Sequence, residues 1–365
     1  MTIAVGAGYR ADLEALRRRS RAHEASAVPG SPAAASEQLT LRHREVMLTG
    51  GHPDELLSLG RALERALARF PGWPDLALLR AGVALAVHRA DVARAALDAL
   101  PELAEQPPGR VLAADIAAFS GNYRAAREGY ERAVREDPLW DTTARLAALD
   151  VATGRFAEAD QRYAEAEEEI TAKQMRAFAW VRVQRADLAR GLDDLDHAAA
   201  WLTAADRAYP GWWYVSAHRA ALDLAADSAW AAAEGYRRVL ADVDRPEFRE
   251  ALGTALARTG NAAAAARCHA AAREAYLRSA LRGEVHYLHH LAAHYADVVP
   301  DPAAAVAWAE RDARLRRSGP TLSLLGWCLF RAGRVDEARA AIAEALALGA
   351  GDPRLLERAR VVGVG

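Results

Sequence analysis

One stretch, residues 120–138, constrains the fold of this chain more than any other part of it. Its sequence is SGNYRAAREGYERAVREDP. Aromatic and small residues alternate at gaps of 3, 4, 3 and 5 in the order Tyr123, Ala126, Tyr130, Ala133 and Pro138. Small residues let two helices approach closely, aromatic residues fill the space beside them, and a proline ends the helix. The stretch therefore predicts the second helix of a helical hairpin.

The same pattern recurs along the chain, which indicates repeated hairpins. It returns within residues 141–170 as Gly154, Phe156, Ala159, Tyr163 and Ala166. This recurrence resembles the tetratricopeptide repeat (TPR), a helix–turn–helix unit of about 34 residues. The units to which the resemblance extends are 75–103, 108–139, 141–170, 174–210, 212–246, 248–282, 285–318 and 320–350. It implies an all-α chain folded as a right-handed α-solenoid of stacked TPR-like hairpins. Asp150 departs from the repeat, where an apolar or aromatic residue is usual.

The chain divides into three regions around this array. Residues 1–50 form an N-terminal helical extension, in which 10–24 reads as a charged amphipathic helix and 26–36 as a Pro/Gly/Ser linker. Residues 51–350 form the repeat array of about eight units. Residues 351–365 form a C-terminal cap and tail, because an array needs a helix that covers its last apolar face.

Composition agrees with a helical array. The chain has 365 residues, of which 52% are hydrophobic but only 7% aromatic, because alanine dominates. Alanine is the strongest helix former. Arginine supplies the positive charge apart from Lys173, the only lysine, and this bias indicates a GC-rich, bacterial genome.

Charge and cysteine content set expectations about partners and compartment. The formal net charge is −2, and acidic and basic residues are interleaved, which argues against a nucleic-acid-binding surface. Cys268 and Cys328 form no CxxC motif, so a disulfide framework is excluded. No signal peptide and no uninterrupted apolar segment of membrane-spanning length is found. We therefore expect a cytoplasmic protein with no nucleic-acid or membrane partner.

The most unusual segment is 284–297, with the sequence EVHYLHHLAAHYAD, which holds four of the eleven histidines. The TPR resemblance implies that the first helices of the hairpins line a concave groove. In that register Leu288 and Leu291 take packing positions. The residues expected to face or border the groove are His286, His289, His290, Asp297 and, near its edge, His294.

Two interpretations of these histidines stay open. His286, His290 and His294 are spaced four apart, so their imidazoles lie on one helix face and could share a divalent metal ion, with Asp297 as a further ligand. Alternatively, the histidines pack, hydrogen-bond to neighbours, titrate near neutral pH or contact a partner. The glutamate of HExxH is missing, so a metalloprotease is excluded. No cofactor other than this metal is considered.

Aromatic residues mark two further candidate surfaces. Trp327, Phe330 and Arg331 are expected to face the groove, where they would suit an apolar side chain beside a carboxylate; plain core packing is the alternative. The cluster 212–214, Trp-Trp-Tyr, either anchors a partner or fills the junction left by the long unit 174–210. We favour the junction.

No P-loop, dinucleotide fingerprint, GxSxG elbow or CxxC zinc pattern is present, so no catalytic residue is assigned. The predicted function is a non-enzymatic scaffold or adaptor that holds a protein or peptide partner in the concave groove. The alternative is a metal-binding or catalytic protein that uses the histidine-rich helix 286–297. A homo-oligomer, and a regulator with residues 1–50 as effector, stay open.

Overall fold

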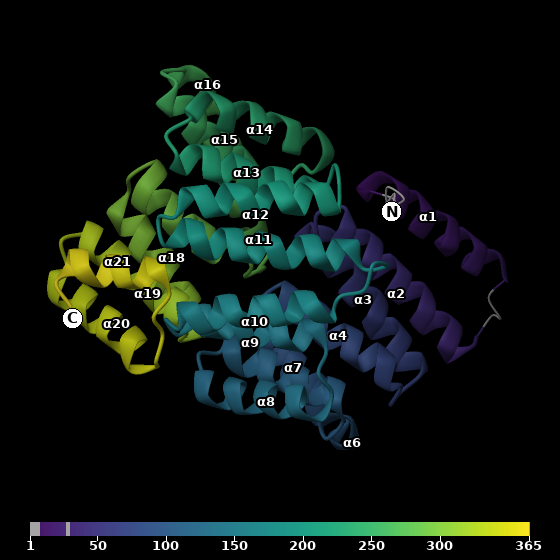
Figure 1. The fold of residues 1–365 in the computed structure, drawn as a ribbon. Coiled ribbons are helices and arrows are strands. Elements are labelled where there is room, and N and C mark those ends of the chain that lie inside the picture. Colours follow the sequence, from purple (N-terminus) through teal and green to yellow (C-terminus); the bar gives the residue numbers. More distant parts are fainter. Residues whose placement is uncertain (1–7, 27–29, 365) are drawn as a thin grey trace.

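The structure is a computed structural model that describes residues 8–26 and 30–364 (Figure 1). These residues form 21 α-helices and one π-helix, and no strand. In chain order the elements are α1 (Tyr9–Ser26), α2 (Pro32–Leu48), α3 (Pro53–Arg69), α4 (Pro74–Ala86), α5 (Ala90–Asp98), α6 (Pro101–Ala104), α7 (Pro107–Phe119), α8 (Tyr123–Glu136), α9 (Trp140–Ala152), α10 (Phe156–Glu169), α11 (Met175–Gly191), α12 (Leu195–Ala208), α13 (Trp213–Ala225), α14 (Ala229–Asp242), α15 (Pro246–Arg258), α16 (Ala262–Leu281), α17 (Leu288–Ala293), η1 (His294–Val298), α18 (Pro302–Leu315), α19 (Gly319–Arg331), α20 (Val335–Ala347) and α21 (Pro353–Val362).

One recurring turn joins the two helices of each hairpin. In seven hairpins the residue two positions beyond the first helix has a left-handed backbone. These residues are His88, Gly121, Gly154, Asp193, Asp227, Gly260 and Gly333. Glycine suits the position because it has no Cβ to clash there. In two of the turns an asparagine follows and caps the second helix, since the side-chain oxygens of Asn122 and Asn261 each accept a backbone N–H three residues on, at 3.2 Å.

The alternation of small and aromatic residues places its members at the helix crossings, as the sequence predicts. Ala126 is fully buried, and Tyr130 and Ala133 are each 3% exposed. Close approach is required beside them: a Cβ on Gly129 would lie 2.9 Å from the Cβ of Ala114 on the facing helix α7. Asp150, the departure from the repeat, is fully buried and its carboxylate pairs with Arg127, Arg155 and Arg162. A local ion-pair network thus replaces the usual apolar contact.

The N-terminal helices fold back onto the middle of the array. Tyr9 and Leu48 share a hydrophobic core with residues of α11, α12 and α13. The indole N–H of Trp213 donates to the carbonyl oxygen of Leu48 at 2.8 Å, and the Arg245 guanidinium donates to the carbonyl oxygen of Gly50 at 2.8 Å. Residues that are about two hundred positions apart are therefore in direct contact, and α1 and α2 lie side by side over one end of the molecule (Figure 1).

The C-terminal hairpin closes onto the second and third hairpins in the same way. The backbone N–H of Gly319 donates to the Tyr123 hydroxyl at 2.8 Å, and the N–H of Gly351 donates to the carbonyl oxygen of Ala152 at 2.9 Å. Leu322 belongs to one buried cluster with Tyr123 and with residues of α9 and α21. The stacked hairpins thus curve back on themselves until distant units meet.

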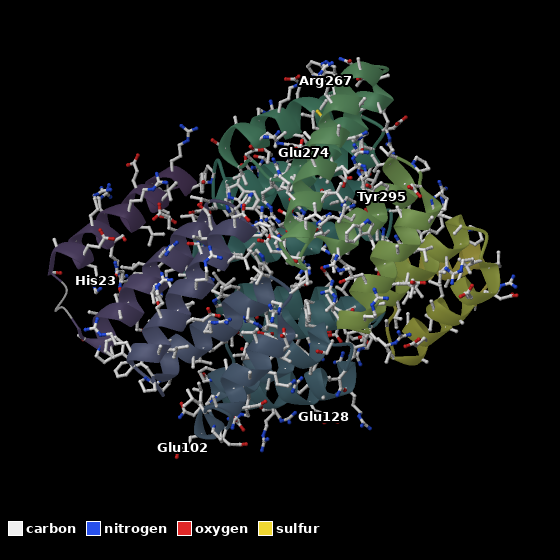
Figure 2. The ribbon with its side chains drawn as sticks, turned by 180° about the vertical axis from the view of Figure 1, so that it is seen from behind. His23, Glu102, Glu128, Arg267, Glu274 and Tyr295 are labelled. Carbon is white, nitrogen blue, oxygen red and sulfur yellow. The ribbon has the colours of Figure 1, made fainter. Side chains whose placement is uncertain are left out.

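Helix boundaries settle several local expectations. Helix α1 confirms the helix predicted at 10–24, but α2 already begins at Pro32, so the predicted linker 26–36 is shorter than expected; residues 27–29 lie outside the described residues. Helix α21 confirms a helix at the C-terminal end of the array. None of the described helices combines the length and hydrophobicity that crossing a bilayer requires. Figure 2 shows Glu102 and Glu128 at one edge of the array and Arg267 at the opposite edge.

Candidate functional site

A cavity of about 1080 Å³ lies between the N-terminal helices and the first helices of two middle hairpins. We call it the aromatic cavity. Its lining residues are Asp12 and Leu16 of α1, Arg44, Met47 and Leu48 of α2, Trp140, Asp141 and Arg145 of α9, Ala172, Lys173 and Gln174 before α11, Met175, Arg176, Ala177 and Trp180 of α11, and Tyr209 and Trp212 before α13. Because α1 and α2 fold back over the array, they form one wall of this cavity.

Four aromatic side chains line the cavity in two pairs. Trp140 is the first residue of α9, two positions after Pro138. Its ring contacts that of Trp180 edge-on, with centroids 6.3 Å apart. Tyr209 and Trp212 form the second pair, with centroids 5.6 Å apart and planes at 84°. Edge-to-face pairs hold aromatic rings in a defined orientation. The cavity therefore offers a fixed apolar surface, to which the side chain of Met47 adds.

The charged residues of the cavity are unevenly paired. Its acids are engaged: Asp12 accepts a hydrogen bond from the Tyr209 hydroxyl at 2.8 Å, and Asp141 pairs with Arg145 at 2.9 Å. Burial, together with Asp12, raises the pKa of Tyr209, which keeps it a neutral donor. Three exposed cations, Arg44, Lys173 and Arg176, make no ion pair or side-chain hydrogen bond within the described part of the chain.

The histidine-rich segment contacts the first hairpin at the turn between α4 and α5. The ring of His289 lies 5.3 Å from that of His88, which sits in the α4–α5 turn, and 4.1 Å from that of His290. His290 stacks on Tyr276 at 5.2 Å, and His286 is 5% exposed. His286 is thus buried, whereas His289 and His290 are partly exposed and pack against one another, against Tyr276 and against His88 of the first hairpin. We call this cluster of His88, His286, His289 and His290 the histidine face.

Burial keeps the imidazoles of the histidine face neutral. It lowers the pKa of His88 to about 2, of His290 to about 3 and of His286 to about 4, and it holds the pKa of His289 well below its ordinary value. Nearby guanidinium groups of Arg316 and Arg245 act in the same direction. None of the cavities described here is lined by these four histidines.

The three histidines considered as metal ligands have different partners. His286 Nε2 lies 3.2 Å from the Ser279 hydroxyl, His290 stacks on Tyr276, and His294 Nδ1 lies 2.5 Å from the Glu250 carboxylate. Within residues 8–26 and 30–364, no group of three or more His, Cys, Asp or Glu side chains is arranged to hold a metal ion. The π-helix η1 begins at His294. His286 precedes α17, which begins at Leu288, so the three histidines do not lie on one continuous α-helix as the shared-ion geometry requires.

The other residues expected in the groove form a separate surface patch. The Trp327 indole N–H donates to the Asp297 carboxylate at 2.9 Å, and Trp327 stacks on Phe330 at 5.8 Å. The guanidinium groups of Arg331 and Arg358 lie over the Trp327 ring, 5.8 and 5.7 Å from its centroid. Asp297 and Arg331 are exposed, whereas Trp327 and Phe330 are partly buried. The structure thus separates the expected groove set into the histidine face and this patch.

Comparisons with known proteins show what the chain resembles. Its sequence matches no family model and no curated protein. The structure of the human IFIT1 dimer with m7Gppp-AAAA is similar over 94% of this chain and 87% of that one, with 14% sequence identity and a TM-score of 0.51. An IFIT1 monomeric mutant with Gppp-AAAA covers 92% of this chain and 95% of its own, at 13% identity and a TM-score of 0.50. A tetratricopeptide repeat protein from Parabacteroides merdae covers 66% of this chain and 93% of its own, at 16% identity and a TM-score of 0.46.

The stacked hairpins, their shared left-handed turn and the small residues at their crossings complete the assignment. This chain has the fold of a tetratricopeptide repeat solenoid. The sequence predicts the hairpins of this TPR solenoid but not the aromatic cavity. Arg44 meets Lys173 and Trp180 only after the N-terminal helices fold back. One signal was present in the sequence: the only lysine and a tryptophan, Trp180, lie close together around the start of the longest unit.

The cluster 212–214 has the packing role favoured for it. Trp212 and Trp213 are 6% and 7% exposed and belong to the core that joins α1 and α2 to the middle of the array. Trp212 also lines the aromatic cavity. The same residues thus fill the junction and form part of the candidate site.

Proposed function

We propose that this TPR solenoid is a non-catalytic interaction scaffold and that its aromatic cavity binds a peptide segment of a protein partner. The observation that carries the proposal is the combination of Trp140, Trp180 and Trp212 with unpaired cations in one cavity of about 1080 Å³. Tryptophan, tyrosine and arginine dominate the energetics of protein interfaces. A cavity of this size accommodates several residues of an extended chain.

The other surfaces of the inner side, the histidine face and the patch around Trp327, are weaker candidates for the binding site than the aromatic cavity. The histidine face lines none of the described cavities, so it offers a partner no pocket among the described residues. The patch of Asp297, Trp327, Phe330 and Arg331 is accessible, and we propose it as a secondary contact for the same partner. The fold shared with IFIT1 carries no ligand to this chain, because likeness at 14% identity shows architecture only.

A peptide-display selection tests the proposal. Purified full-length protein is used to enrich peptides from a random library, and the affinity of the enriched peptides is measured by isothermal titration calorimetry. Met47→Trp fills the mouth of the cavity at a side chain that is 44% exposed, so the fold is preserved. We expect this variant, and Trp140→Leu, to weaken binding by about tenfold or more, as the loss of an interface hot spot does.

A matched control separates the cavity from general loss of tryptophan. Trp230 lies outside the cavity and is 72% exposed, so Trp230→Leu should leave the affinity unchanged. Circular dichroism and thermal melting establish that each variant is folded. Enriched peptides that bind Met47→Trp and Trp140→Leu as well as the wild type would place the binding site elsewhere, and a selection that enriches nothing would count against a peptide-binding scaffold.

A further inference from the structure

The cavity has an excess of positive charge that the fold does not use. Arg44 lies on α2, whereas Lys173 and Arg176 lie around the start of α11, so two segments far apart in the sequence bring cations to one cavity. None of the three has a carboxylate partner in the described residues, although many exposed arginines elsewhere are paired. This local excess stands in a chain whose formal net charge is −2.

A buried donor without an acceptor lies in the same wall. Trp212 is 6% exposed and its indole N–H has no hydrogen-bond partner among the described residues. Leaving a buried donor unsatisfied costs about 1–3 kcal/mol. In contrast, the adjacent Trp213 N–H is satisfied by the Leu48 carbonyl. The lining therefore holds more cations than carboxylates, and the Trp212 N–H has no acceptor among the described residues.

We infer that the aromatic cavity recognises an acidic peptide segment, whose carboxylates pair with Arg44, Lys173 and Arg176 while an apolar side chain contacts Trp140 and Trp180. The inference rests on the proposed function, because it names the chemistry of the ligand at the same site. A peptide fits better than a nucleic acid. The fixed carboxylates of Asp12 and Asp141 in the same wall would repel a regularly charged phosphate backbone, whereas a peptide can place its charges at the three cations alone.

The test compares selections on two charge-matched variants. In the first, Arg44, Lys173 and Arg176 are all replaced by Gln; in the second, Arg94, Arg124 and Arg267, which are exposed and lie outside the cavity, are replaced by Gln. Both variants lose three positive charges. Peptides enriched on the wild-type protein should be acidic, should bind the first variant about tenfold or more weakly, and should bind the second variant unchanged. Their affinity should also fall as NaCl is raised from about 50 to 300 mM.

Each outcome decides between this inference and the proposed function. Enriched peptides that are neutral or basic, yet still lost on Trp140→Leu, would overturn the acidic ligand and leave the scaffold proposal standing. A tetra-adenylate oligonucleotide that binds more tightly than every enriched peptide, and loses affinity on the first variant, would overturn the peptide in favour of nucleic acid. The absence of any enriched peptide would end both proposals.

Discussion

Two regions of the inner side, the aromatic cavity and the histidine face, show how one solenoid surface acquires two roles. Both are built largely on first helices, α9 and α11 in one case and α17 in the other. The cavity holds exposed cations without partners among the described residues, whereas in the histidine face His88 of the first hairpin packs against His289 and burial keeps the imidazoles neutral. The two regions differ in what the chain places beside them, since the turn between α4 and α5 brings His88 against His289, whereas α1 and α2 form one wall of a cavity beside α11.

The largest expected effect is a loss of stability in acid, centred on the histidine face. The pKa values of His88, His286, His289 and His290 are depressed in the folded state, so the unfolded chain binds more protons below about pH 6.5. Stability should be constant above that pH and fall by up to about 1.4 kcal/mol per pH unit for each histidine as the pH is lowered toward 5. Desolvation raises the pKa of half-buried Asp115, which acts in the opposite direction. Urea unfolding at several pH values measures the slope; a flat profile between about pH 7 and 5 would show that the face is solvated.

Sequence alone predicts the repeating part of this molecule because each hairpin is specified locally. The alternation around Tyr130 and the turn glycines Gly121 and Gly154 act within one unit. The closure is not visible in the sequence, because it depends on contacts such as that between Gly319 and Tyr123, which are 196 positions apart. The histidines were identified as unusual, but whether they face a groove or another hairpin depends on that closure. The cavity was missed for the same reason.

The second prediction concerns a substitution, Leu322→Ala, that removes a contact between the C-terminal hairpin and the hairpins on which it packs. Leu322 is fully buried in the cluster that joins α19 to α8 and α9, so Leu322→Ala leaves a cavity at the closure. We expect the free energy of unfolding to fall by about 2–5 kcal/mol. Leu356, on α21, is 43% exposed, and Leu356→Ala should change the free energy by less than about 1 kcal/mol. Equal effects of the two variants in urea unfolding would show that the closure contributes little to stability.

A third prediction assigns the acid sensitivity to one contact. In His289→Phe an aromatic ring is kept against His88 and His290, but one buried titratable group is lost. The slope of stability against pH near pH 5 should decrease by about 1.4 kcal/mol per pH unit, while peptide affinity at neutral pH is unchanged. The control is His197→Phe, because the side chain of His197 is 72% exposed and His197 lies far in the sequence from the residues of the histidine face. A decrease in slope for both variants would contradict the assignment.

The smallest expected effect on stability is at the cations of the aromatic cavity, the second of the two regions compared. Lys173 and Arg176 are exposed and have no ion-pair partner in the described residues, so replacing either by Gln removes no contact that stabilises the fold. The free energy of unfolding should stay within about 0.5 kcal/mol of the wild-type value. Thermal and urea unfolding measure this directly. A larger loss of stability would mean that these charges serve the fold itself, and the distinction between a surface kept open for a ligand and a surface closed by the chain would no longer hold.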